Sequence, residues 1–226
     1  DGAPQTEADM AATIRDLAIS PLGLRAGDPF RISLAGAQEK TAFLWHDGAW
    51  LKPNGLTPTT HIFKRPMGVV SQGIDMTDSV ENEWLCLRLA AALGLPVNEA
   101  RIESFEDQTV LIITRFDRAP RDRGGILRLP QEDFLQALGF ESGQKYQEHG
   151  GPSMQDGLRL LEGSRERAAN QLLYLKAQIV NWVLAAIDGH AKNYSLFLGP
   201  GGFGMTPLYD ILSAAPAVEK GAFRHK

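Results

Sequence analysis

The chain is poor in cysteine, in basic charge and in long apolar runs. Cys86 is the only cysteine among 226 residues, so no intramolecular disulfide can form, and we expect a buried thiol in a reducing compartment. Acidic residues outnumber basic ones by 27 to 23, and the net charge of -4 gives no general electrostatic footprint for nucleic acid. No apolar run approaches the roughly 18 residues that span a bilayer, and the N-terminal segment lacks the basic and apolar regions of a secretory signal. These absences predict a cytoplasmic protein that does not bind DNA by itself.

Metal-binding patterns built on histidine are also missing. The histidines show no zinc-type spacing with one another or with the cysteine. A chain of 226 residues can nevertheless bury a sizeable core, and its 43% hydrophobic and 22% charged composition is that of an ordinary globular protein. We expect one or two compact units. The histidines are His46, His61, His149, His190 and His225.

The first part of the chain has the pattern of short strands interrupted by helices. Residues 6–19 predict an amphipathic helix with Thr6 as its N-cap. Strand-like runs follow over residues 30–36, 40–53, 60–66 and 100–117, with a hairpin turn at His46-Asp47-Gly48. Between them, residues 78–96 predict a helix that Asp78 or Ser79 caps.

After Pro120 the pattern becomes mainly helical. Helices are predicted over residues 130–139, beginning on Pro130, over 153–163, capped by Ser153, and over 164–187, which is the longest apolar helix. A strand, a Gly-Pro-Gly-Gly turn and a second strand follow over residues 194–209. The change predicts a β-rich lobe over residues 1–117 and a mainly helical lobe over 118–226, with a ligand site between them. The core positions expected of the longest helix are Leu172, Leu175, Ile179 and Val183.

The segment DGHAKN, residues 188–193, directly follows the longest predicted helix. Gly189 with the cationic side chains of His190 and Lys192 could simply cap that helix. However, a helix C-terminus disfavours the carboxylate of Asp188 by some tenths of a kcal/mol unless a cation offsets the repulsion. The segment therefore favours a nearby cation, such as a metal ion.

Asp188 and Asn193 also have the interval of the D-x-x-x-x-N catalytic loop of protein kinases. In that loop the carboxylate accepts the proton of the substrate hydroxyl, and the amide oxygen is a hard ligand suited to Mg²⁺. Asp210 in TPLYDI follows the predicted strand-turn-strand, where a kinase carries its second metal-binding aspartate, although a turn residue is an equally good interpretation.

Two segments upstream suit phosphate binding. SLAGAQEKT, residues 33–41, could direct backbone N–H groups at phosphate oxygens, but it is neither a Walker A motif nor G-x-G-x-x-G and could be an ordinary hairpin connection. Lys64 in HIFKRP could contact the α and β phosphates or could be a solvated strand lysine. Glu83 is the acid expected to pair with Lys64, and Glu81 is the alternative.

Taken together, these motifs closely resemble the HipA family of bacterial serine/threonine kinases, which are toxins of type II toxin–antitoxin systems. The resemblance implies an α+β, bilobal, protein-kinase-like fold related to the phosphoinositide kinases, with a β-rich N-terminal lobe and a helical C-terminal lobe. Family members usually carry a further N-terminal β-rich subdomain and more helical sequence after LSAAPAV, and we expect this chain to lack both. The matching motifs, in order between about Leu22 and Pro216, are SLAGAQEKTAFL, GLTPTTHIFKRP, SVENEWLCL, RFDR, RLPQEDF, KYQEHGGP, DGHAKNYS and TPLYDI.

The resemblance also implies a role for each matching residue. Asp188 would be the catalytic base, Asn193 and Asp210 the Mg²⁺ ligands, and Ser33 the autophosphorylated residue that switches the kinase off. Lys64 would bind phosphate with Glu83 as its partner, and His190 and Lys192 would lie beside the phosphates. The phosphate loop would be Ala35, Gly36, Ala37, Gln38, Glu39 and Lys40, and the hinge beside adenine would be Thr114, Arg115 and Phe116.

The function implied is that of an ATP- and Mg²⁺-dependent protein serine/threonine kinase that arrests growth. The family points to an aminoacyl-tRNA synthetase as the substrate, with the glutamyl enzyme the best-known case, and to a HipB-like DNA-binding antitoxin as the partner. DNA would be contacted only through that antitoxin. The alternative is a catalytically silent binding module that serves as antitoxin partner and co-repressor.

Overall fold

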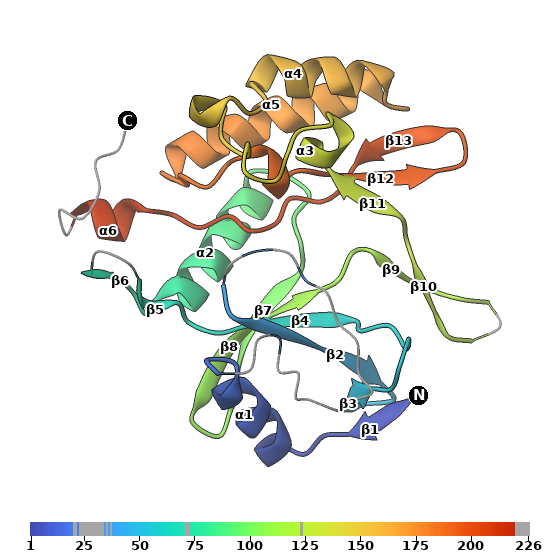
Figure 1. Cartoon of the computed structure of the whole chain (residues 1–226), viewed down its shortest axis with the longest axis vertical. Coiled ribbons are helices and arrows are strands. Elements are labelled where there is room, and N and C mark those ends of the chain that lie inside the picture. The colour runs from blue at the N-terminus through green and yellow to red at the C-terminus, as the bar shows by residue number, and fades with distance from the viewer. Residues whose placement is uncertain are drawn as a thin grey trace. The chain divides into compact units, whose positions relative to one another are not determined.

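The computed structural model describes residues 1–19, 22, 34, 36, 38–70, 73–122 and 124–219. These residues form a mixed α/β fold with four sheets (Figure 1). The chain divides into two compact units, of which the first comprises Asp1–Trp84 and Glu99–Leu127, and the second comprises Leu85–Asn98 and Arg128–Lys226. The division passes through helix α2 (Ser79–Ala92), so neither unit is one continuous stretch of sequence.

The first unit is built on a six-stranded antiparallel sheet with the order β1-β3-β2-β4-β8-β7. The turn between β2 and β3 is Asp47-Gly48, with φ of 49° and 78°, which is the primed hairpin geometry that Asp-Gly favours. The predicted hairpin is therefore confirmed. The strands are β1 (Gly2–Pro4), β2 (Lys40–His46), β3 (Ala49–Pro53), β4 (His61–Lys64), β7 (Ala100–Phe105) and β8 (Gln108–Thr114).

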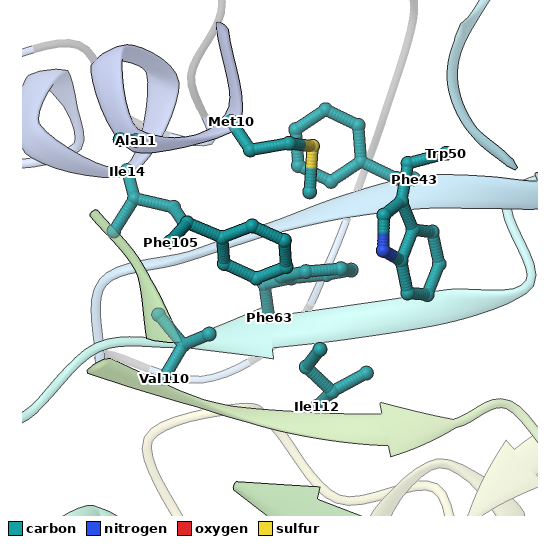
Figure 2. Close-up of a cluster of buried hydrophobic side chains, with 9 residues drawn as sticks. All are labelled: Met10, Ala11, Ile14, Phe43, Trp50, Phe63, Phe105, Val110 and Ile112. Atoms are coloured by element: carbon teal, nitrogen blue, oxygen red, sulfur yellow. The ribbon is translucent and has the colours of Figure 1, made fainter. Parts of the chain in front are cut away.

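Helix α1 (Glu7–Asp16) packs against this sheet through a cluster of buried apolar side chains (Figure 2). The helix begins as predicted, because Thr6 is its N-cap and forms a capping box with Asp9. The rings in the cluster meet edge to face, as between Phe43 and Phe63, whose centroids are 5.0 Å apart. The cluster consists of Met10, Ala11, Ile14, Phe43, Trp50, Phe63, Phe105, Val110 and Ile112.

Side chains alternate along strand β8, so its two faces are buried against different elements. Val110 and Ile112 belong to the cluster beneath α1, whereas Leu111 and Ile113 pack with Val80 near the start of α2. The middle of β8, residues 110–113, is therefore apolar on both faces of the sheet. A charged site on the α2 face must then come from the neighbouring strands and from α2 itself.

Smaller elements complete the two units. In or beside the first unit, β5 (Gly68–Val70) pairs with β6 (Ile74–Met76), and β9 (Arg118–Pro120) pairs with β10 (Ile126–Arg128). The second unit contains a three-stranded sheet of β11 (Gln131–Asp133), β12 (Ser195–Gly199) and β13 (Gly202–Met205). Its helical elements are α3 (Phe134–Ala137), η3 (Gln147–His149), α4 (Met154–Leu160), η4 (Leu161–Gly163), α5 (Arg167–Val183), η5 (Ala191–Asn193) and α6 (Ala215–Glu219). Among the described residues, no helix combines the length and the apolar content that a membrane crossing requires.

Two predicted helix boundaries in the second unit differ in outcome. Ser153 caps α4 through a capping box with Asp156, as predicted. The prediction that a helix begins on Pro130 is wrong, because residues 131–133 pair with β12 and the helix starts only at Phe134. Asp133 ends the strand and caps α3, so one residue marks both boundaries.

The expected core of the longest helix is also wrong. Helix α5 buries Tyr174, Ala177 and Val180, whereas the four leucine, isoleucine and valine positions expected in the core are between 36% and 62% exposed. Apolar residues lie on both sides of this helix, and periodicity alone does not say which stripe meets the rest of the unit. The exposed residues are Leu172, Leu175, Ile179 and Val183.

Candidate functional site

The first unit holds a buried ion pair between strand β4 and helix α2. Nζ of Lys64 lies 2.7 Å from Oε1 and 3.0 Å from Oε2 of Glu83, and the two side chains are 9% and 1% exposed. Glu81, the alternative partner, is exposed on the same helix. Because removing one member of such a pair leaves a buried charge, which costs about 3 to 5 kcal/mol, each residue depends on the other.

Lys40 adds a second positive charge beside this pair. The register of β2 and β4 places Lys40 directly opposite Lys64, and directly opposed residues project to the same face of a sheet. Both lysines are buried, since Lys40 and Lys64 are 6% and 7% exposed when the whole residue is counted. A Cβ built on Gly36 would lie 2.5 Å from Nζ of Lys40, so the backbone before β2 lies against that ammonium group. Lys40, Lys64 and Glu83 together carry one net positive charge on this face, which favours an anionic ligand such as a phosphate.

The predicted phosphate loop is only partly described. Ser33, Ala35 and Ala37 lie outside the described residues. Gln38 donates from Nε2 to the carbonyl oxygen of Arg65 at 2.7 Å, and Glu39 pairs with the guanidinium of Arg65 at 3.0 Å. These two side chains anchor the end of the predicted loop to Arg65, the residue that follows β4.

The predicted hinge, Thr114 to Phe116, continues into a buried charged cluster. Arg115 donates from Nε and Nη2 to the two carboxylate oxygens of Asp117, at 2.9 and 2.7 Å, and Arg118 also bonds this carboxylate at 2.7 Å. Burial would raise the pKa of Asp117, but the hydrogen bonds and charges of the two arginines outweigh it and lower that pKa. The side chain of Arg115 is therefore committed to Asp117, so a ligand at this segment would meet mainly its backbone and Phe116.

In the second unit, the chain leaves helix α5 earlier than predicted. The helix ends at Val183, Leu184 is its C-cap, and Ala185 takes the left-handed conformation with φ of 51°. Gly189 does not cap the helix, and Asp188 lies beyond its last turn, where the helix dipole has little effect. The capping interpretation is wrong, and the dipole argument for a cation has no support in the structure.

One pocket of the second unit brings the three predicted catalytic residues together. Asp188, Asn193 and Asp210 all line it. Nδ2 of Asn193 donates to the carbonyl oxygen of Asp188 at 2.8 Å, so the amide oxygen is the atom left to bind a cation. Asp210 has φ of 58°, a conformation that costs most residues energy but that aspartate tolerates, and such outliers concentrate at functional sites. The other lining residues are Ala177, Asn181, Ala186, Gly189, Tyr194, Leu208, Tyr209, Ile211 and Leu212.

A close contact explains the glycine in DGHAKN. A Cβ on Gly189 would lie 2.8 Å from Nδ2 of Asn181, and that same nitrogen donates to the hydroxyl oxygen of Tyr194 at 2.7 Å. Tyr209 holds the following turn, since its hydroxyl donates to the carbonyl oxygen of Lys192 at 3.0 Å. The segment from 188 to 193 is therefore fixed from two sides.

His190 and Lys192, predicted beside the phosphates, have different surroundings. Burial lowers the pKa of His190 despite the nearby charge of Asp188, so the imidazole is neutral at neutral pH. Among the described residues, Nδ1 of His190 is buried with no hydrogen-bond partner, and such a group is usually satisfied by a ligand or a water molecule. Nζ of Lys192 pairs with Oδ2 of Asp133 at 3.0 Å.

The donor set of the pocket fits Mg²⁺ only with help from a ligand. Within the described ranges, no group of three or more histidine, cysteine or acidic side chains could hold a metal ion alone. One carboxylate from Asp210 and one amide oxygen from Asn193 are hard ligands, and Mg²⁺ commonly combines one or two such groups with water and substrate phosphates. The residues present therefore fit a magnesium ion that arrives with a nucleotide.

Three residues of the site had no predicted role. Tyr146 donates a short hydrogen bond from its hydroxyl to Oδ1 of Asp188, Asp117 binds both arginines of the hinge cluster, and Asp133 pairs with Lys192. Each lies in a motif that the sequence singled out, KYQEHGGP, RFDR and RLPQEDF. The partners of Tyr146 and Asp133 are far away along the chain, at 42 and 59 residues, whereas the two arginines that bind Asp117 are its neighbours in RFDR, so the sequence could have indicated that cluster.

Comparisons with known proteins agree with these motifs. A family model described as the HipA-like C-terminal domain matches residues 32–226. Y4mE of Sinorhizobium fredii (strain NBRC 101917 / NGR234), which is named as a kinase, is 38% identical over 212 residues, covering 93% of this chain and 49% of the relative. The serine/threonine-protein kinase toxin HipA of Shewanella oneidensis is 31% identical over 218 residues, covering 88% of this chain and 47% of the relative. The chain thus spans about half the length of the curated relatives it matches.

Solved structures show the same likeness. A chain of the Shewanella oneidensis MR-1 toxin–antitoxin complex of HipA, HipB and operator DNA has a TM-score of 0.80 at 27% identity, covering 100% of this chain and 53% of that chain. The Helicobacter pylori proinflammatory kinase CtkA has a TM-score of 0.57 at 15% identity, covering 79% of this chain and 56% of that chain, which shows likeness of fold alone. The family that the motifs predicted is confirmed, and this chain belongs to the HipA-like C-terminal domain family, in which the curated relatives given above carry kinase names.

Proposed function

We propose that this chain is the catalytic part of an ATP- and Mg²⁺-dependent protein serine/threonine kinase that acts as a growth-arresting toxin. In this proposal residues 1–117 supply the nucleotide-binding lobe and residues 118–226 supply the catalytic lobe. The observation that carries it is that Asp188, Asn193 and Asp210 line one and the same pocket. A base, an amide ligand and an acidic ligand in one pocket are the groups that phosphoryl transfer to a hydroxyl requires.

The buried pair in the first unit supports nucleotide binding. Glu83 holds the ammonium of Lys64 in place through both carboxylate oxygens, and Lys40 lies directly opposite on the next strand. Ammonium groups held in this way can neutralise the α and β phosphates of ATP without reorganising when the nucleotide binds. A magnesium ion, when bound, would supply further neutralisation of phosphate charge.

Asp188 is assigned the role of general base. Its side chain is 47% exposed, so a substrate hydroxyl can reach the carboxylate from solvent. The neutral imidazole of His190, 3.2 Å from Oδ1, does not cancel the charge that makes this carboxylate a base. Proton acceptance by such a group typically contributes roughly 10²- to 10⁴-fold to the rate.

The substrate and the partner are proposed from the family. The resemblance points to an aminoacyl-tRNA synthetase as the phosphorylated protein, with the glutamyl enzyme as the first candidate. The Shewanella oneidensis complex contains HipB and operator DNA. We therefore propose a HipB-like antitoxin as the partner of this chain, with DNA contacted only through that antitoxin.

The test is transfer of label from [γ-³²P]ATP in the presence of Mg²⁺ to a protein of a cell extract, followed by identification of the labelled protein. We expect transfer by the wild-type chain and a loss of at least about 10²-fold in Asp188→Asn, with ATP affinity retained. ATP binding without transfer would favour the silent binding module instead. Equal transfer by the Asp188→Asn variant would contradict the assignment of the base.

Self-inactivation is proposed at Ser33. A phosphoserine adds about -1.5 to -2 charges, which the adjacent loop could not hold while it also bound the phosphates of ATP. We expect mass spectrometry to locate the autophosphate on Ser33, and we expect Ser33→Ala to slow the loss of activity during incubation with ATP. An autophosphate on a different residue would contradict this proposal.

A further inference from the structure

The segment from Gln144 to Gly151, which contains most of KYQEHGGP, folds tightly back on itself. Residues 147–149 form the 3₁₀ turn η3, and the N–H groups of His149 and Gly151 both donate to the carbonyl oxygen of Tyr146 at 3.0 Å. A Cβ on Gly151 would lie 2.0 Å from the carbonyl oxygen of Gln144, so no larger residue fits there without moving the backbone. This winding fixes the backbone of Tyr146 independently of any ligand.

The same segment is attached to the catalytic segment by three contacts. The hydroxyl of Tyr146 donates to Oδ1 of Asp188, and the N–H of Ala191 donates to the carbonyl oxygen of Lys145 at 3.4 Å. The Tyr146 ring meets the His190 ring edge to face, with centroids 5.0 Å apart. One of these contacts holds the carboxylate and the other two hold the residues that follow it.

The hydrogen bond leaves one carboxylate oxygen for chemistry. Oδ1 of Asp188 accepts from Tyr146 and lies 3.2 Å from Nε2 of His190. Within the part of the chain that the structure describes, Oδ2 accepts no hydrogen bond. A carboxylate held through one oxygen presents the other in a defined direction, and general bases act only within hydrogen-bond reach of the proton that they accept.

The electrostatics keep Tyr146 a donor. Burial, followed by the hydrogen bond and charge of Asp188 and the charge of Glu148, raises the pKa of its phenol far above the ordinary value of 10. The ammonium of Lys145 lies 4.9 Å from the ring centroid, and the ring of His149 lies 5.7 Å from it. The phenol therefore keeps its proton over the whole range in which a kinase works.

We propose that Tyr146 is a positioning residue for phosphoryl transfer, whose hydroxyl orients the carboxylate of Asp188 so that Oδ2 receives the proton of the substrate hydroxyl. This inference rests on the proposed function. In the step itself the substrate oxygen forms a bond to the γ-phosphorus, the bond from that phosphorus to the bridging oxygen of ADP breaks, and the substrate proton passes to Oδ2. Tyr146 donates a hydrogen bond throughout and transfers no proton.

The test compares Tyr146→Phe with Tyr174→Phe in the kinase assay. Tyr146→Phe keeps the half-buried ring and its contacts and removes only the donor. Tyr174 is a buried tyrosine of the same unit that, like Tyr146, does not line the pocket, and its ring packs against Phe134 and Tyr194. Removing a hydrogen bond to a charged group is expected to lower the rate on the order of tenfold. We expect kcat to fall by about tenfold in Tyr146→Phe with the KM for ATP within about twofold of wild type, and no change in Tyr174→Phe.

A double-mutant cycle separates positioning from a general structural role. If the hydroxyl acts through Asp188, Tyr146→Phe has no further effect on the residual rate of Asp188→Asn. Should Tyr146→Phe lower the melting temperature more than Tyr174→Phe does, Tyr146→p-aminophenylalanine restores a donor, and we expect it to recover most of kcat. A failure to recover, or a further loss in the Asp188→Asn background, would overturn the inference.

The remaining outcomes distinguish this inference from the proposed function. If the wild-type chain transfers phosphate and Tyr146→Phe is equally fast, only the positioning role is overturned. If Tyr146→Phe is faster, the hydroxyl occupies the place of the substrate and inhibits the site, which also overturns positioning. If the wild-type chain transfers no phosphate to any protein, the proposed function fails and this inference fails with it.

Discussion

Exchanging Glu83 for glutamine tests whether the ion pair with Lys64 is required for folding, for ATP binding or for both. Glu83→Gln keeps the shape of the side chain and removes the charge that compensates a lysine whose side chain is 9% exposed. Breaking a buried pair in this way costs about 3 to 5 kcal/mol, and the glutamine oxygen can still accept one bond, so we expect about 3 kcal/mol. For a chain of this size that loss lowers the melting temperature by roughly 6 to 12 °C.

A double variant separates the two roles of the pair. Replacing both members by apolar residues of similar size is often neutral, so Lys64→Met/Glu83→Leu is expected to melt within a few degrees of wild type. The same variant is expected to lose ATP binding, because no ammonium remains at position 64. Thermal unfolding followed by tryptophan fluorescence measures the melting temperature, and calorimetry with ATP and Mg²⁺ measures the affinity for ATP.

The matched control is Glu81→Gln, an exposed acid on the same helix, for which we expect less than about 0.5 kcal/mol. Glu83→Gln with the stability of wild type would refute the argument from buried charge. A double variant that binds ATP as tightly as wild type would refute the role of Lys64 in nucleotide binding, whatever its stability.

Three further predictions concern other parts of the chain. Asp210→Asn keeps a residue type that tolerates φ of 58° and removes the charge of the carboxylate. It is expected to weaken Mg²⁺-dependent ATP binding about tenfold or more in calorimetry. Unchanged affinity for ATP would exclude Asp210 as a metal ligand. Burial, and secondly the charge of Arg101, lowers the pKa of His61 from 6.5 to about 4. Between pH 4 and 6.5 the unfolded chain therefore binds more protons than the folded chain, so stability falls as the pH drops from 6.5 to 4. His61→Gln is expected to flatten the pH dependence of the unfolding midpoint between pH 4 and 6.5, and a slope equal to that of wild type would contradict this. Ile179 is 61% exposed, so Ile179→Ala is expected to change the free energy of unfolding by less than about 0.5 kcal/mol. Val180 is 6% exposed, so Val180→Ala is expected to lower that free energy by about 1 kcal/mol or more. The reverse order would mean that α5 buries the stripe that periodicity predicted.

Features whose partners lie within a few residues could be predicted from the sequence. The capping boxes at Thr6 and Ser153 and the turn at Asp47-Gly48 are formed by neighbouring residues, so their residue types are sufficient signals. The family and the candidate residues Asp188, Asn193 and Asp210 also came from motifs in the chain. Local propensity could not place the start of α3, because residues 131–133 form a strand only through pairing with β12, far along the chain.

Tertiary structure decided which of the chemically possible partners meet. Glu83 rather than Glu81 reaches Lys64 because the rotation of α2 about its axis turns one acid toward the sheet and the other to solvent. Tyr146 and Asp188 are 42 residues apart, and only the winding of the segment before α4 brings the phenol to the carboxylate. The sequence by itself determined the family, the residue types of the site and the local caps and turns, since each is set by motifs or neighbouring residues. The exposed stripe of α5, the buried charge pair and the hydrogen bond to Asp188 depend on the orientation of whole elements, which only long-range packing determines.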